Sequence, residues 1–195
     1  MKTRMFRHIL AMTLVLACIN AGACDPPAKA DDFPEFASVS GCELVKQDKV
    51  IILKGADFDR ARLWTKAEYA PPFALRVKAK TDARNLRLYY TNGVVIFNWE
   101  GNENELRLHD PVTGGGFGIG VPGQGKIEPD KYHDIVWEVY PDGMRVLVNG
   151  KERARLVGNY EKLKAPVGIG PAFGSVITME SFKVETLTGK IPEQK

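Results

Sequence analysis

Residues 131–156 read KYHDIVWEVYPDGMRVLVNGKERARL and decide the fold. Apolar side chains occupy alternate positions before Pro-Asp-Gly at 141–143, and they do so again between that turn and Asn-Gly at 149–150. A period of two places one set of side chains on one face of a sheet. Asp-Gly and Asn-Gly tolerate the positive φ that two-residue hairpin turns require. The stretch therefore predicts a three-stranded antiparallel meander.

Alternation of this kind continues on both sides of the meander. Short apolar or alternating runs recur from residue 50 onward, separated by Gly, Pro and Asn, and residues 114–125 are a glycine-rich loop. No stretch keeps a period of about 3.6 residues over three turns, so helices are not expected. About ten strands spaced roughly 8–12 residues apart predict an all-β antiparallel sandwich over residues 41–188, followed by a C-terminal tail at 189–195.

The first 23 residues have the order of a secretory signal peptide. Lys2, Arg4 and Arg7 precede an apolar run at 9–19, which leads to Ala-Gly-Ala at 21–23. A basic region, an apolar region and small residues at the cleavage point are the parts of such a signal. The run is shorter than the roughly 20 residues that a membrane-spanning helix needs. We therefore expect residues 1–23 to be removed and the protein to be exported, to the periplasm, the envelope or the medium.

Removal of this segment balances the charge of the chain. Three of the 27 basic residues and none of the 24 acidic residues lie within 1–23, so the net charge falls from +3 to zero. A neutral chain without a basic stripe does not suit a nucleic-acid partner. We therefore expect no nucleic acid to bind.

Cys24 follows the Ala-Gly-Ala sequence directly, and two interpretations of it remain open. In the first, a lipoprotein peptidase cleaves before Cys24, which becomes lipidated and anchors the protein to a membrane, although the usual Leu three residues earlier is absent. In the second, the ordinary signal peptidase cleaves there, and Cys24 pairs with Cys42 in an oxidising compartment. Residues 24–40 are rich in Pro, Ala and Asp and are expected to form a tether.

Several features of the chain, in their order, resemble one fold family. They are Phe-x-Leu-x-Val at 73–77, Tyr-His at 132–133, the Asp-Gly turn, Val-x-Val-Asn-Gly at 146–150 and Gly-x-Gly at 168–170. Together they resemble the concanavalin A-like lectin/glucanase fold, and within it laminin-G-like and bacterial sugar-active jelly-roll domains. The resemblance implies a jelly roll whose concave face holds a saccharide. It does not choose a function, because this fold hosts lectins, hydrolases and interaction modules.

Three of the expected strands, at 86–90, 94–99 and 105–109, turn polar side chains toward one face of the sandwich. The candidate ligand-binding residues on them are Tyr89, Asn98, Glu100, Arg107 and His109. An aromatic ring can stack on a pyranose, and amide, carboxylate, guanidinium and imidazole groups can bond its hydroxyls. The implied partner is a polysaccharide or oligosaccharide. The competing interpretation is a solvated face on which opposite charges pair across strands.

A hydrolytic alternative depends on Glu100, Glu103 and Glu105. Glycoside hydrolysis needs two carboxyl groups, about 5–5.5 Å apart in retaining enzymes or about 6.5–9.5 Å apart in inverting ones. On an extended strand, the Cα atoms of Glu103 and Glu105 are about 6.5–7 Å apart. Retaining glucanases of the resembling fold carry Glu-x-Asp-x-x-Glu, however, and residues 102–106 lack the Asp. The sequence therefore favours a non-catalytic protein.

Metal ligands are sparse in this chain. After removal of the signal peptide only His109 and His133 remain as histidines, without a cysteine pair at zinc-ligand spacing, so no cofactor is expected. Calcium stays open, because Asp110, Asp130 and Asp142 lie in loops. Aspartates at such positions also form turns without any metal.

The sequence thus favours an exported, non-catalytic, lectin-like carbohydrate-binding module at the bacterial cell envelope. The alternatives are a sugar-active hydrolase of the same fold and an envelope protein-interaction module. An exposed aromatic side chain on the concave face would favour the first, and a close carboxyl pair in a cleft the second. Of the three tryptophans, Trp64 and Trp137 are expected in the core, and Trp99 is the best candidate for exposure.

Overall fold

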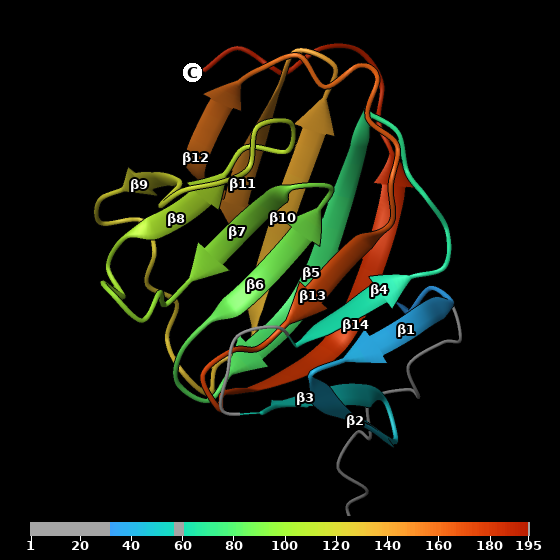
Figure 1. Ribbon diagram of the computed structural model, residues 1–195, viewed down its shortest axis with the longest axis vertical. Helices are drawn as coiled ribbons and strands as arrows, with labels where there is room; N and C mark the ends of the chain where they lie inside the picture. Colours follow the sequence, from blue (N-terminus) through green and yellow to red (C-terminus); the bar gives the residue numbers. More distant parts are fainter. Residues whose placement is uncertain (1–31, 57–60, 195) are drawn as a thin grey trace, which may run out of the picture.

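The computed structural model describes residues 32–56 and 61–194. Within this part of the chain, fourteen strands form two seven-stranded antiparallel sheets that pack face to face (Figure 1). The predicted all-β antiparallel sandwich is confirmed. No helix in these residues is long and apolar enough to cross a membrane. The predicted signal peptide and Cys24 lie outside the described residues.

The two sheets are here called sheet A and sheet B. Sheet A has the strand order β1 (Phe36–Ser40), β4 (Arg62–Thr65), β13 (Val167–Gly170), β6 (Leu86–Tyr90), β7 (Gly93–Phe97), β8 (Leu106–His109) and β9 (Ile119–Val121). Sheet B has the strand order β12 (Lys151–Val157), β11 (Gly143–Val148), β10 (His133–Tyr140), β5 (Phe73–Thr81), β14 (Val176–Thr186), β3 (Val50–Gly55) and β2 (Cys42–Gln47).

The predicted meander forms β10, β11 and β12 of sheet B. Trp137 pairs with Val146 across the first turn, and Val146 pairs with Ala154 across the second. Asn149 and Gly150 have φ values of 50° and 77°, the left-handed conformation that a tight hairpin turn requires. The register is well specified, because a slip by one residue would move Trp137 from the core to the outer face.

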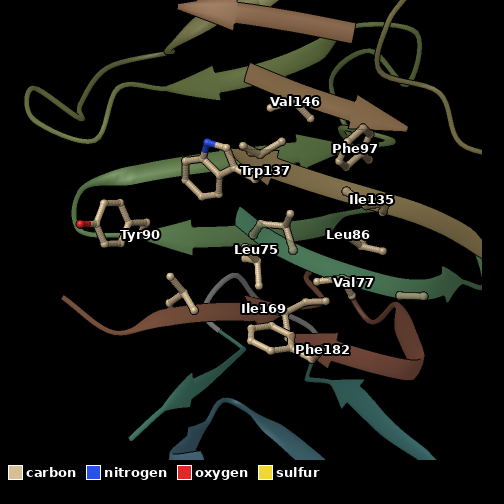
Figure 2. Close-up of a cluster of buried hydrophobic side chains, with 14 of the residues drawn as sticks. Leu75, Val77, Leu86, Tyr90, Phe97, Ile135, Trp137, Val146, Ile169 and Phe182 are labelled. Atoms are coloured by element: carbon tan, nitrogen blue, oxygen red, sulfur yellow. The ribbon is translucent and has the colours of Figure 1, made fainter. Parts of the chain in front are cut away.

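Both sheets contribute to one apolar core, part of which Figure 2 shows. Trp137 is fully buried there, as predicted, and its indole N–H donates to the sulfur of Met144 at 3.1 Å. The Tyr90 ring lies edge-on to Phe73 and to Trp137, with centroid distances of 4.9 and 6.5 Å. The Tyr90 hydroxyl donates to the carbonyl of Tyr69 at 2.9 Å, so this core ring leaves no polar group unpaired. Aromatic pairs of this kind add about 0.5–1.5 kcal/mol beyond their burial.

Strand β13 approaches β4 so closely that two of its positions require glycine. A Cβ at Gly170 would lie 1.7 Å from the carbonyl oxygen of Ala61. A Cβ at Gly168 would lie 2.8 Å from the Trp64 ring. Because Gly168 has no side chain, the Trp64 ring lies against the β13 backbone on the outer face of sheet A.

Two short strands fall where the sequence predicted none. Strand β1 occupies the end of the predicted tether and pairs with β4, so the boundary at residue 41 is too late. The Phe36 ring packs edge-on to Phe182 at 5.6 Å, which attaches this segment to the core. Strand β9 lies inside the predicted glycine-rich loop and pairs with β8.

Candidate functional site

The outer face of sheet A brings several of the predicted residues together. On β6, Leu86, Leu88 and Tyr90 are fully buried in the core, and the alternate residues Arg87 and Tyr89 project from the other side. This agrees with the predicted alternation of the strand.

Strand pairing aligns the outward residues in two rows across the sheet. The first row runs through Trp64, Gly168, Tyr89, Val94 and His109. The second row runs through Gly170, Arg87, Ile96, Arg107 and Gly120.

A hollow of about 380 Å³ opens beside the first row, and we call it the Trp64 pocket. It is lined by Arg62, Trp64, Tyr89, Thr91, Asn92, Val94, Thr113, Gly114 and Gly115. The wall formed by residues 113–115 belongs to the loop after β8. Asp110 fixes that loop, because its Oδ1 accepts hydrogen bonds from the backbone N–H groups of Val112 and Thr113 at 2.8 and 2.9 Å.

Arg62 covers Tyr89 within the pocket. The guanidinium carbon lies 4.8 Å from the centroid of the Tyr89 ring, and the Trp64 ring lies 5.7 Å from the same ring. Tyr89 is consequently only 4 % exposed, and burial raises the pKa of its hydroxyl while Arg87 and Arg62 oppose that rise. The stacking role expected for Tyr89 does not fit this burial, since the ring is already covered.

Trp64 is the partly exposed aromatic residue of this pocket, and the expectation that it lies in the core is wrong. Leu63 and Thr65 take the inward positions of β4, so Trp64 and Arg62 face outward. Neither residue was among the ligand-binding candidates predicted from the sequence. The signal that could have found them is the alternation of Arg62 and Trp64 with Leu63 and Thr65.

Asn98 is buried and hydrogen-bonded within the protein, which does not fit the role in ligand binding expected for it. It is 1 % exposed, and its amide nitrogen donates to the carbonyls of Ala83 and Ile127 at 3.1 and 2.9 Å. Its Oδ1 accepts from the Ile127 N–H at 2.8 Å. Its φ of 48° ends the alternation of β7, and the following Trp99 lies 4.0 Å from the Arg107 guanidinium. Trp99 is partly exposed, as the sequence predicted.

The three candidate carboxylates are each engaged by a different cation. Glu100 lies 3.5 Å from Arg87, and Glu105 lies 2.5 Å from Arg107, both on the outer side of sheet A. Glu103 lies instead in an exposed turn, where it pairs with Lys126 at 2.7 Å. A glycosidase needs two carboxyl groups that flank one bond of the substrate, and these three carboxylates are instead held in separate ion pairs. The geometry therefore gives the hydrolytic alternative no support.

His109 connects the first row to the wall of the pocket. Its imidazole forms a hydrogen bond with the backbone of Gly115, which raises its pKa. Burial has the larger effect, and Arg107 and Arg87 act in the same direction, so the pKa of His109 is lowered overall. His109 is thus held neutral near pH 7.

This lowered pKa makes stability depend on pH. The unfolded chain, with a histidine pKa of about 6.5, binds a proton more readily than the folded chain. The contribution of neutral His109 is therefore complete above about pH 6.5 and is lost as the pH falls below that value. We expect the melting temperature of the unaltered protein to fall more between about pH 7.5 and pH 5.5 than that of His109→Gln, measured by thermal unfolding. Equal falls would contradict this assignment.

The candidate calcium ligands do not gather in one place. Within 32–56 and 61–194, no group of three or more His, Cys, Asp or Glu side chains could hold a metal ion. Asp110 accepts the Tyr160 hydroxyl at 2.6 Å, and Asp142 accepts the Ile191 N–H at 3.0 Å. Asp130 is exposed in a turn with a φ of 57°.

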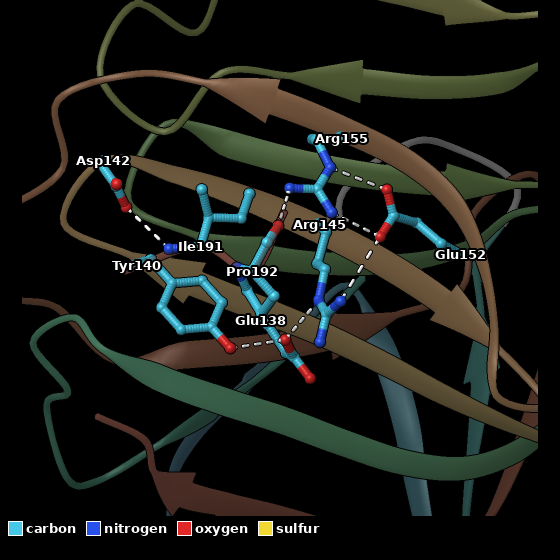
Figure 3. A network of polar contacts seen from close by, with 8 residues as sticks. All are labelled: Glu138, Tyr140, Asp142, Arg145, Glu152, Arg155, Ile191 and Pro192. Carbon is cyan, nitrogen blue, oxygen red and sulfur yellow. Dashed lines mark hydrogen bonds and ion pairs between the residues drawn. The ribbon is translucent and has the colours of Figure 1, made fainter. Parts of the chain in front are cut away.

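A larger hollow, of about 1060 Å³, lies along β12 and the C-terminal segment. Arg145, Arg153 and Arg155 line it, and Figure 3 shows that Arg145 and Arg155 are paired with carboxylates. Arg153 donates to the carbonyl of Gln124 at 3.3 Å. Arg145 bonds Glu138 at 2.6 Å, and Arg155 holds both carboxylate oxygens of Glu152 at 2.8 and 2.9 Å. These cations hold three strands together, so the hollow is a weaker ligand-site candidate than the Trp64 pocket.

The two packed sheets and their strand order define the concanavalin A-like lectin/glucanase jelly-roll fold, as the sequence predicted. This fold is shared by carbohydrate-binding modules, lectins and glycoside hydrolases. No protein-family model matches the chain, and no curated protein is detectably similar in sequence.

Solved structures show the likeness. The chain is similar to the carbohydrate-binding module CBM66 from Bacillus subtilis, with a TM-score of 0.61 and 8 % identity over 78 % of this chain and 96 % of that one. It is similar to the Ca2+/Man-bound VIP36 exoplasmic/lumenal domain, with a TM-score of 0.59 and 10 % identity over 77 % and 83 % of the two chains. It is also similar to an endo-β-1,3-glucanase from Pyrococcus furiosus, with a TM-score of 0.53 and 14 % identity over 80 % of each. Identities this low show the fold alone.

Proposed function

We propose that the protein is an exported, non-catalytic carbohydrate-binding module of the bacterial envelope and that the Trp64 pocket is its binding site. The observation that carries the proposal is a partly exposed indole ring beside a hollow of about 380 Å³ with polar side chains around it. Asn92 and Thr113 stand at the exposed rim, and Arg62 lies within. An aromatic face with convergent hydrogen-bonding groups suits a sugar ring.

Two further observations support this proposal. The fold is one on which carbohydrate-binding modules and lectins are built. The amino-terminal sequence has the parts of a secretory signal, and Cys24 offers either a lipid anchor or a disulfide partner for Cys42.

Replacing Trp64 by alanine is expected to weaken saccharide binding at least about 10-fold, because the variant loses the stacking surface while the strand remains. The test is a calorimetric and fluorescence screen of the mature chain against oligo- and polysaccharides, with and without calcium. Tyr132→Ala is the matched control: Tyr132 is also partly exposed and lies under a cation, Lys80, 5.4 Å from its ring, but outside the pocket.

The same screen separates the alternatives. New reducing ends after long incubation would favour a sugar-active hydrolase. If Trp64→Ala and Tyr132→Ala weaken saccharide binding equally, the binding site is not the Trp64 pocket. If a folded protein binds no member of the panel, the protein-interaction alternative takes the place of the proposal.

A further inference from the structure

Three arginines on the outer side of sheet A are each placed against an aromatic ring. Arg62 on β4 lies 4.8 Å from the Tyr89 ring and 6.0 Å from the Trp64 ring. The other two stacks are Arg87 on Phe173 at 5.6 Å and Arg107 on Trp99 at 4.0 Å. The strands that carry them, β4, β6 and β8, all belong to sheet A.

Arg62 differs from the other two in its surroundings. Arg87 and Arg107 have carboxylate partners in Glu100 and Glu105. Arg62 contacts the two rings and, within the described part of the chain, forms no ion pair with a carboxylate; its Nε, like that of Arg107, is buried without a hydrogen-bond partner there. No acidic side chain lines the Trp64 pocket among the residues described. Among the described residues, the lining of the pocket therefore has one cation and no anion.

A cation in this position is suited to bind an anion. A guanidinium whose charge no neighbouring carboxylate offsets gains a charge-assisted hydrogen bond when an anion enters the pocket. A guanidinium presents parallel N–H groups that match a carboxylate in a bidentate pair, and such charge-assisted bonds are stronger than neutral ones. The rings of Tyr89 and Trp64 hold the Arg62 guanidinium in place and restrict its solvation.

We propose that the Trp64 pocket selects acidic saccharides and that Arg62 binds the carboxylate of a sugar acid. The inference rests on the function proposed above and specifies its ligand. Trp64 provides the stacking surface for the ring, and Arg62 provides the charge that distinguishes a sugar acid from the neutral sugar.

The experiment compares three pairs of ligands that differ in the carboxylate: oligogalacturonate and its methyl ester, sialyllactose and lactose, and glucuronoxylan and xylan oligosaccharides. Calorimetry with the mature chain is expected to give at least about 10-fold tighter binding of one acidic member than of its neutral partner. Arg62→Gln is expected to abolish that preference, and Arg62→Lys to keep part of it. Lys80→Gln is the control: it removes a cation from the Tyr132 ring and is expected to keep the preference for the acidic ligand.

The outcomes separate this inference from the function on which it rests. Equal affinity for the two members of a pair, or equal weakening of both by Arg62→Gln, overturns the selection of acids and leaves saccharide binding in place. Binding of neutral members alone has the same consequence. If a folded protein binds no member of any pair, both proposals fail. Thermal unfolding of each variant establishes that the protein is folded.

Discussion

Replacing Asn98 by alanine is expected to lower the free energy of unfolding by about 3 kcal/mol or more. The amide of Asn98 makes three hydrogen bonds: a partly buried one to the carbonyl of Ala83, and two buried ones, to the carbonyl and from the N–H of Ile127. Alanine leaves these backbone groups without partners, and each group that water does not reach then costs about 1–3 kcal/mol of folding free energy. Alanine also tolerates the φ of 48° less well than asparagine does.

Urea unfolding followed by tryptophan fluorescence measures this loss. Asn98→Gly separates the two causes, because glycine accepts the left-handed conformation but makes no side-chain hydrogen bond. Asn102→Ala is the matched control, because Asn102 is exposed and its side chain accepts one hydrogen bond, from the Asn104 N–H at 3.2 Å. This substitution is expected to lower the free energy of unfolding by less than about 1 kcal/mol. If Asn98→Ala costs no more than Asn102→Ala, the amide does not hold these segments together.

Asn98 also marks the limit of what could be predicted from the sequence. Alternation holds for Val95 and Phe97, which are fully buried in the core, because both lie in a regular strand with one covered face. It failed at Asn98, where a left-handed residue ends the strand and makes three long-range bonds in place of facing outward. A local pattern cannot report a hydrogen bond to residue 127, which is distant in the sequence.

The missed strands have a related cause. Strands β1 and β9 lie at edges of sheet A, and most of their side chains are exposed or only partly buried, so no apolar alternation marks them. The meander, in contrast, was predicted correctly because its inner face is fully covered. For the candidate site, the sequence grouped Tyr89, Arg107 and His109 on one face, and all three lie on strands of sheet A. Trp64 was missed as a pocket residue. It lies on β4 and Tyr89 lies on β6, and the two strands are brought close only because β13 pairs with both.

Arg145→Met is the other substitution with a large expected effect, a loss of about 3 kcal/mol in the free energy of unfolding. Glu138 has a side chain only 8 % exposed and accepts bonds from Arg145 Nε at 2.6 Å and from the Tyr140 hydroxyl at 2.9 Å, as Figure 3 shows. Removal of the guanidinium leaves this carboxylate with one neutral donor in a poorly solvated place. The double variant Glu138→Gln, Arg145→Met is expected to recover most of the loss, because a neutral amide needs no counter-charge.

Arg76→Met provides a control of the same geometry. Arg76 Nε also lies 2.6 Å from a carboxylate oxygen, that of Glu185, but these side chains are 42 % and 50 % exposed. Solvent screening makes such pairs worth less than about 1 kcal/mol, so the same chemical change should cost little there. Urea unfolding of both single variants compares one ion pair in two environments. If Arg76→Met and Arg145→Met cost the same, burial of Glu138 is not the source of the effect. If only Arg145→Met is severe, the pairing of β10 with β11 depends on Arg145 to compensate the buried charge of Glu138.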